Sequence, residues 1–239
     1  MQRLIPFRAL LIPWLCWACL GAPLNAQTST VKLNVSVMHP GTAKGKQFDA
    51  AGTVVWLTPS QQISASPLAK PGHYRLTQKD KQFTPHLLVI PTGSTVDFPN
   101  LDPFFHNVFS LFNGKRFDLG LYESGSSRTV HFNRDGVSYI FCNIHPEMSA
   151  IVITLPTPYY DVSSAEGAVT LRSVPPGSYD FHAWVEGASA RDLEALDRKV
   201  LVTPGETDLG SIAIKVDAHA GSHKNKFGED YQSPDEPIY

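Results

Sequence analysis

The feature that most constrains this chain is the recurrence of short β-rich runs between turn-forming residues. In residues 31–37, Val and Leu alternate with Lys, Asn and Ser, which is the two-residue period of a strand with one buried face. Similar runs occupy residues 53–57, 85–90, 95–98, 107–109, 129–132, 137–141, 150–155, 168–171, 179–185, 199–202 and 210–215. The 17 glycines and 19 prolines disfavour long helices, and only residues 190–196 suggest a helix, of one or two turns. The pattern predicts an all-β chain rather than a helical bundle.

The first residues are typical of an export signal. Two arginines precede an apolar run over residues 9–20, and residues 22–26 read Ala-Pro-Leu-Asn-Ala, a plausible cleavage region. We therefore expect a signal peptide over residues 1–26, a periplasmic or secreted protein, and no membrane span after cleavage. A permanent membrane anchor and a lipid anchor on Cys19 are the alternatives, but the apolar run is short for a span and Cys19 matches a lipidation site only in part.

Charge and apolar content limit the kinds of partner. Lys and Arg number 20 against 22 Asp and Glu, which gives a net charge of -2, and no long block of one sign occurs. This balance argues against nucleic acid as a partner. A hydrophobic content of 42% is enough for the cores of one large or two small domains.

The cysteine content predicts one unpaired thiol in the mature chain, that of Cys142. Signal cleavage removes Cys16 and Cys19 and leaves Cys142 as the only thiol, so no disulfide can form within the mature chain. An unpaired thiol in an oxidising compartment has to be buried or engaged. A buried structural thiol and a metal ligand are the two interpretations.

Four potential metal donors accompany this thiol. Cys142, His145 and Met148 follow one another at a spacing of three, and Pro146 argues against one helical face, so a loop is expected. His106 lies 36 residues before Cys142, at the junction of a turn and a strand, and two strands of one sandwich could bring them together.

The donor set favours copper. Zinc binds thiolate and imidazole readily but rarely a thioether, whereas two histidines, a cysteine and a distant methionine suit both oxidation states of copper. Met148 alone would be ordinary core filling, and His106 alone an ordinary loop histidine. Together, in this order, the four predict a copper site.

The middle of the chain resembles the cupredoxins, the blue copper electron carriers. The Cys-x2-His-x2-Met loop with proline directly after the histidine is most similar to amicyanin-type members, because plastocyanin-like members place the methionine further away. Residues 78–83, 98–100 and Asp102 also resemble the opening strands of that family, and the resemblance covers about residues 72–158. It implies a Greek-key β-sandwich. One departure is Ile144, where many relatives have proline.

The resemblance also assigns the site. It implies one type 1 copper ion with His106, Cys142 and His145 as equatorial ligands and Met148 as the axial ligand. Asn107 resembles the residue whose backbone N–H reaches the cysteine sulfur.

The flanks resemble small transthyretin-like or carboxypeptidase regulatory-like sandwiches. Residues 175–179 read Pro-Pro-Gly-Ser-Tyr, the turn that leads into a strand in those folds. Neither flank has enough strands alone, so we predict one discontinuous sandwich from residues 28–70 and 159–216, with the copper domain, 72–158, inserted between. The alternative is a cupredoxin with irregular extensions.

The remaining C-terminal residues, 217–239, are expected to form a flexible tail. They carry Gly, Ser, Pro and mixed charges with little apolar content. His219 and His223 lie four apart there, and we expect them to be solvated rather than to bind metal in a fixed geometry.

The resemblance implies a periplasmic electron carrier or relay, not an enzyme, whose redox partner is a cytochrome c or a dehydrogenase. A copper carrier or sensor would use the same ligands and is the alternative function. An enzyme is the weakest interpretation, because the sequence lacks the several His-x-His pairs of a trinuclear copper centre and no acid-base group accompanies Cys142.

Overall fold

The computed structural model describes residues 28–38, 50–61, 69–111, 114–217 and 223–231, and the predicted signal peptide lies outside them. The all-β prediction is confirmed: apart from one short helix, α1 (Ala190–Glu194), the elements of the described residues are strands. The predicted short helix is confirmed as well, and Ser189 caps it by accepting a hydrogen bond from the backbone of Asp192. No helix within the described ranges is long and apolar enough to cross a membrane.

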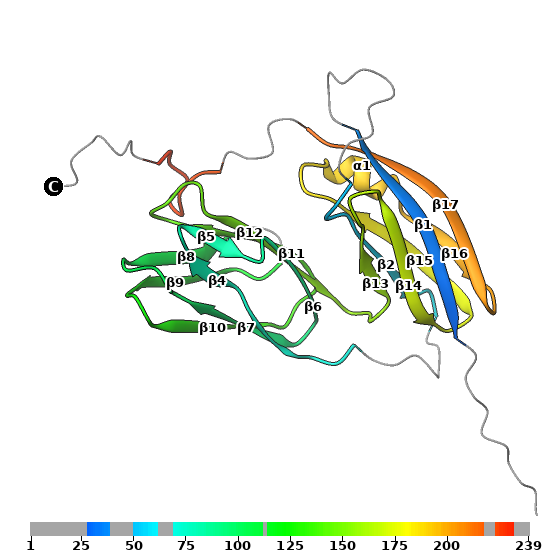
Figure 1. Cartoon of the computed structure of the whole chain (residues 1–239), viewed down its shortest axis with the longest axis horizontal. Coiled ribbons are helices and arrows are strands. Elements are labelled where there is room, and N and C mark those ends of the chain that lie inside the picture. Colours follow the sequence, from blue (N-terminus) through cyan, green and yellow to red (C-terminus); the bar gives the residue numbers. More distant parts are fainter. Residues whose placement is uncertain (1–27, 39–49, 62–68, 112–113, 218–222, 232–239) are drawn as a thin grey trace, which may run out of the picture.

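The strands form two bodies, which Figure 1 shows as separate groups. The flanking sandwich is made of β1 (Ser29–Met38), β2 (Val54–Pro59), β13 (Tyr160–Val162), β14 (Ala168–Val174), β15 (Gly177–Trp184), β16 (Arg198–Val202) and β17 (Glu206–Lys215). The middle sandwich is made of β3 (His73–Arg75), β4 (Thr77–Lys79), β5 (Gln82–Thr84), β6 (Leu87–Pro91), β7 (Ser94–Pro99), β8 (His106–Ser110), β9 (Phe117–Tyr122), β10 (Ser127–Phe132), β11 (Gly136–Cys142) and β12 (Ser149–Leu155).

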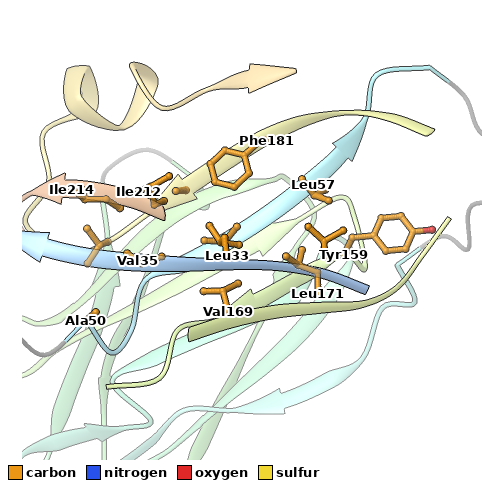
Figure 2. Packing of buried hydrophobic residues seen from close by; sticks show 14 of the residues in the cluster. Leu33, Val35, Ala50, Leu57, Tyr159, Val169, Leu171, Phe181, Ile212 and Ile214 are labelled. Atoms are coloured by element: carbon orange, nitrogen blue, oxygen red, sulfur yellow. The ribbon is translucent and has the colours of Figure 1, made fainter. Parts of the chain in front are cut away.

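The flanking sandwich joins strands from both ends of the chain. Its sheets have the orders β14-β1-β17 and β13-β2-β15-β16, so β1 and β2 pair with strands that follow the middle sandwich in sequence. In β1 the side chains of Val31, Leu33, Val35 and Val37 are buried and alternate with more exposed residues, as the sequence period predicts. Figure 2 shows Leu33 and Val35 packing against Phe181 and other apolar side chains between the sheets.

The middle sandwich is built from a three-stranded sheet, β10-β7-β3, and a five-stranded sheet, β6-β12-β11-β8-β9, with β4 and β5 as a separate hairpin. Its core contains Phe98, Phe132, Ile140 and Cys142, all fully or almost fully buried. Cys142, the one cysteine among the residues that the structure describes, is therefore part of the core of this sandwich, at the end of β11.

Strand β12 is buried on both faces. Ala150 and Val152 belong to the core of the middle sandwich, whereas Ile151 and Ile153 belong to a second cluster that includes Trp184 of the flanking sandwich. This explains why β12 has an almost continuous apolar sequence rather than an alternating one. The outer face of the five-stranded sheet is thus the contact surface between the two sandwiches.

An ion pair lies across this contact. The Nε2 atom of His86, in the middle sandwich, is 2.8 Å from a carboxylate oxygen of Glu186, which follows β15. The hydrogen bond with Glu186 raises the pKa of His86, and this effect exceeds the opposing effect of burial. Because both side chains are about half exposed, the apolar cluster contributes more to the contact than this pair does.

We expect Leu155→Ala to lower the free energy of unfolding by about 2–5 kcal/mol, because Leu155 is buried in the cluster between the sandwiches and its removal leaves a cavity. Leu201→Ala is the matched control, since Leu201 lies on β16 with 65% of its surface exposed, and should cost less than about 0.5 kcal/mol. Urea denaturation followed by tryptophan fluorescence measures both. Equal losses would contradict the proposed role of the cluster.

Candidate metal centre

The pairing of β8 with β11 brings the upstream histidine to the cysteine. The strands are antiparallel with Cys142 opposite Val108, and the backbone N–H of Asn143 donates to the carbonyl oxygen of Asn107 over 2.8 Å. His106, the first residue of β8, therefore lies beside Cys142, the last residue of β11. Two residues 36 apart in sequence meet at one end of the sheet.

Three donor atoms converge at this point. The Sγ atom of Cys142 lies 3.6 Å from Nδ1 of His106 and 3.6 Å from Nδ1 of His145. All three atoms lie within 4.8 Å of one another. Metal–ligand bonds of about 2.0–2.3 Å require donors at roughly these separations, so the cluster has the dimensions of a site for one ion. His106 and Cys142 are buried and His145 is half-buried.

Backbone hydrogen bonds within the loop hold the segment that carries His145 in a closed turn. The N–H of Cys142 donates to the carbonyl of Met148 over 3.2 Å, and the N–H of Met148 donates to the carbonyl of His145 over 3.1 Å. The side chain of Met148 is fully buried in the same core cluster as Cys142. Cys142, His145 and Met148 thus lie on one loop and the end of β11, His106 lies at the start of β8, and the donor atoms of Cys142 and the two histidines lie close together.

A buried carboxylate orients His106. The Nε2–H of His106 donates to Oδ2 of Asp102 over 2.9 Å, and the backbone N–H groups of Asp80 and Lys81 donate to the same carboxylate over 2.6 and 3.1 Å. Burial alone would raise the pKa of Asp102, but these hydrogen bonds hold it below its ordinary value. When the Nδ1 proton is released, the proton on Nε2 stays with Asp102 and the lone pair of Nδ1 faces Cys142, as a metal ligand requires.

The turn that supplies these N–H groups is conformationally costly. Asp80 and Lys81 both have left-handed backbones, with φ of 56° and 54°, a conformation that non-glycine residues adopt infrequently. Two successive N–H groups in this geometry form a concave binding site for an anion, which here is the carboxylate of Asp102. The left-handed turn between β4 and β5 therefore supplies the N–H groups that hold Asp102, and Asp102 orients His106.

The thiol of Cys142 is held in an environment that favours the thiolate. Burial alone would raise its pKa, but hydrogen bonds with His106 and from the backbone N–H groups of Asn107, Ile144 and His145 lower it below the ordinary value. The thiolate is the form that binds metal ions.

The pKa of His145 is also lowered, for a different reason. Burial lowers its pKa, and the positive charges of His106 and Lys81 lower it further. The imidazole is thereby kept neutral at pH 7, which is the form that can coordinate a metal.

An aromatic side chain packs against both histidines. The ring centroid of Phe104 lies 5.3 Å from that of His106 and 5.3 Å from that of His145, and the two imidazoles are 4.9 Å apart. This contact restricts both imidazoles to one orientation. The neighbouring Phe105 and Ile144 are exposed, with 50% and 42% of their surfaces accessible.

Sequence reasoning did not identify the parts played by Asp102 and Phe104. The sequence indicates Asp102 only through the family resemblance, and it gives no signal for the role of Phe104. The spacing of four between the carboxylate and His106 is a usable signal, because a turn before a strand can fold such a pair together.

The C-terminal residues differ from the expected flexible tail. Residues 223–231 lie against the middle sandwich, where Figure 1 draws them in red. The hydroxyl of Tyr231 donates to the carbonyl of Cys142 over 2.7 Å, and the ring of His223 stacks on that of Phe141. His223 thus contacts an aromatic ring instead of solvent alone, and His219 lies outside the described residues.

Of the comparisons with known proteins, the one with solved structures gives matches. No family model matches the chain, and no curated protein does. The chain is similar to a purple cupredoxin from Nitrosopumilus maritimus, with 26% identity, coverage of 34% of this chain and 99% of that chain, and a TM-score of 0.31. A copper-containing nitrite reductase from Thermus scotoductus SA-01 is 25% identical, with coverage of 41% of this chain and 25% of that chain and a TM-score of 0.34. An oxidised proline-to-alanine variant of amicyanin is 18% identical, with coverage of 35% and 83% and a TM-score of 0.33.

We expect Asp102→Asn to weaken copper binding by about 10–100-fold, because the amide no longer fixes the tautomer and basicity of His106. Competition with a chelator of known affinity measures the loss. Asp97→Asn is the matched control, because Asp97 pairs with His73 over 2.6 Å at an exposed position of the same sandwich. Equal affinities for the Asp102 variant and the wild type would show that the carboxylate does not orient the ligand.

Proposed function

We propose that this chain is a mononuclear copper protein of the cupredoxin type that carries or relays single electrons. The observation that supports it is the convergence of one buried thiolate-forming sulfur and two imidazole nitrogens within 4.8 Å. His106, Cys142 and His145 would hold the ion, and Met148, buried beside Cys142, would be the weak axial ligand. A bound copper ion supplies a one-electron couple between its cuprous and cupric states.

The protein's own contribution is a site whose donors are fixed by their surroundings. Asp102 holds His106, Phe104 packs against both imidazoles, and backbone N–H groups hold the sulfur of Cys142. Donors that do not move between oxidation states keep the reorganisation small, which favours fast electron transfer. These contacts are therefore the ones an electron carrier needs.

The exposed end of the site gives electrons a route to a partner. His145 is half-buried, and the exposed apolar residues Phe105 and Ile144 are next to His106 and His145 in sequence. A small apolar surface around a redox centre suits brief docking of a second redox protein, and we propose a cytochrome c or a dehydrogenase in the periplasm or outside the cell.

A copper carrier or sensor is the second candidate, because the same donors could pass the ion to another protein. It would require rapid release of copper or a change of conformation. The fully buried positions of Cys142 and His106 favour retention of the ion, and thus the electron carrier. Metal exchange complete within seconds in the presence of a competing chelator would favour the copper carrier instead.

We expect copper-loaded protein to show intense visible absorption that Cys142→Ser abolishes, since the thiolate–copper bond is its source. Met148→Leu is the matched control, because it removes a thioether but leaves the three donors of the described cluster, and should retain the colour. Copper titrations followed by visible and paramagnetic resonance spectra measure both, and circular dichroism checks folding. Colour in the serine variant, or none in the wild type, would overturn the proposal.

We expect Phe105→Lys to slow electron self-exchange between reduced and oxidised copies by at least about tenfold, because it places like charges face to face at the contact. The visible spectrum should not change, since Phe105 is exposed and Phe104 makes the contacts with the ligands. Nuclear magnetic resonance line broadening measures the rate. Leu201→Lys, on the flanking sandwich, is the control, and an equal effect there would exclude Phe105 from the electron route.

A further inference from the structure

Residues 223–231 form a compact turn of their own. The side-chain oxygen of Asn225 accepts hydrogen bonds from the backbone N–H groups of Phe227 and Glu229, over 2.9 and 3.0 Å. The N–H of Gly228 donates to the carbonyl of Asn225, and Gly228 has a φ of 83°, which glycine adopts without strain. This turn presents Lys226 and Tyr231 to the middle sandwich as a preformed unit.

The peptide group that follows Cys142 is held from two sides. Its carbonyl oxygen accepts the hydroxyl of Tyr231 over 2.7 Å, and its N–H, that of Asn143, donates to the carbonyl of Asn107 over 2.8 Å. In a planar trans peptide these two atoms point in opposite directions. The strand that carries His106 therefore fixes one side of this plane, and the C-terminal segment fixes the other.

Lys226 connects the same two strand ends a second time. Its backbone N–H donates to the side-chain oxygen of Asn143 over 2.9 Å, and its ammonium lies 2.9 Å from a carboxylate oxygen of Asp118. The other oxygen of Asp118 accepts the side-chain amide of Asn107 over 2.7 Å. One residue of the segment thus connects the loop after Cys142 with the residue after His106.

Asn107, which Lys226 reaches through Asp118, also contacts the sulfur through its backbone. The N–H of Asn107 is among the groups that hydrogen-bond to the Cys142 thiolate. On the outer face of β11, the ring of His223 stacks on that of Phe141, with centroids 3.9 Å apart, and the ring of Tyr231 meets His223 edge-on. The segment therefore contacts β11 through packing as well as hydrogen bonds.

We propose that residues 223–231, which we call the C-terminal clip, position Cys142 and Asn107 for metal binding. This inference rests on the proposed copper site and deepens it. Lys226 and Tyr231 are positioning residues in this account: they do not contact the donor atoms but hold the peptide group and the amide side chain next to them. Without the clip, the loop after Cys142 keeps only its bonds within the sandwich, so it opens more often and releases the ion faster.

The test is the double variant Lys226→Gln/Tyr231→Phe in the full chain. Lys224→Gln is the matched control, because Lys224 pairs with Asp230 inside the clip, at 3.9 Å, and makes no hydrogen bond or ion pair with the described residues of the middle sandwich. Lys226→Arg, with native Tyr231, should behave like the wild type because it keeps the positive charge beside Asp118.

Two measurements distinguish the proposed role of the clip from the existence of the copper site. Hydrogen–deuterium exchange on metal-free protein, read on peptides that cover residues 139–148, should be faster in the double variant. Copper loss to excess chelator should be at least about tenfold faster, the effect expected of groups that orient metal ligands, and the visible and paramagnetic resonance spectra should shift. The control should match the wild type in every measurement.

Unchanged exchange in the double variant would show that the clip does not hold the loop and would overturn the inference. Faster exchange with unchanged copper loss and spectra would overturn it too, because the clip would then stabilise the loop without positioning ligands. Wild-type protein that binds no copper would instead refute the proposed function, while the exchange data on metal-free protein would still report whether the segment holds the loop.

Discussion

The site depends on the backbone pairing between β8 and β11. Cys142 lies opposite Val108, and the bond from Asn143 to Asn107 extends the pairing by one step beyond the strand. A shift of this register by one residue would turn the Cys142 side chain out of the core, because side chains alternate across a strand. The convergence of sulfur and imidazole is thus a consequence of sheet register, which the buried residues of both strands fix.

Burial of titratable donors would be unfavourable without compensation. The buried carboxylate of Asp102 accepts three hydrogen bonds, from His106 and from the N–H groups of Asp80 and Lys81. The sulfur of Cys142 is compensated in the same way by backbone N–H groups. The carboxylate of Asp102 and the sulfur of Cys142 are therefore paired before any ion binds, and the protein alone holds them in place.

The sequence predicted what local patterns encode and missed what distant contacts determine. The alternation in residues 31–37 is borne out by β1, and the short helix near residue 190 by α1. Strand β9 was missed because Gly120 interrupts its pattern and its pairing with β8 shifts register. The spacing of Cys142 and His145 was readable because it is local. The contact of Tyr231 with Cys142 joins residues 89 apart, and no periodicity in the tail signals it.

The position of the flanking sandwich limits where the site can be approached. The outer face of the five-stranded sheet is covered by the cluster around Ile153 and Trp184, and the C-terminal clip covers Phe141 on the same sheet. Phe105 and Ile144, next to His106 and His145 in sequence, are large apolar side chains that remain exposed. If the chain carries electrons as proposed, a partner would gain most by docking there, because electron transfer weakens steeply with distance and the imidazole of His145 is the half-buried one of the three donors. The flanking sandwich and the clip would then leave this end of the molecule for such a partner.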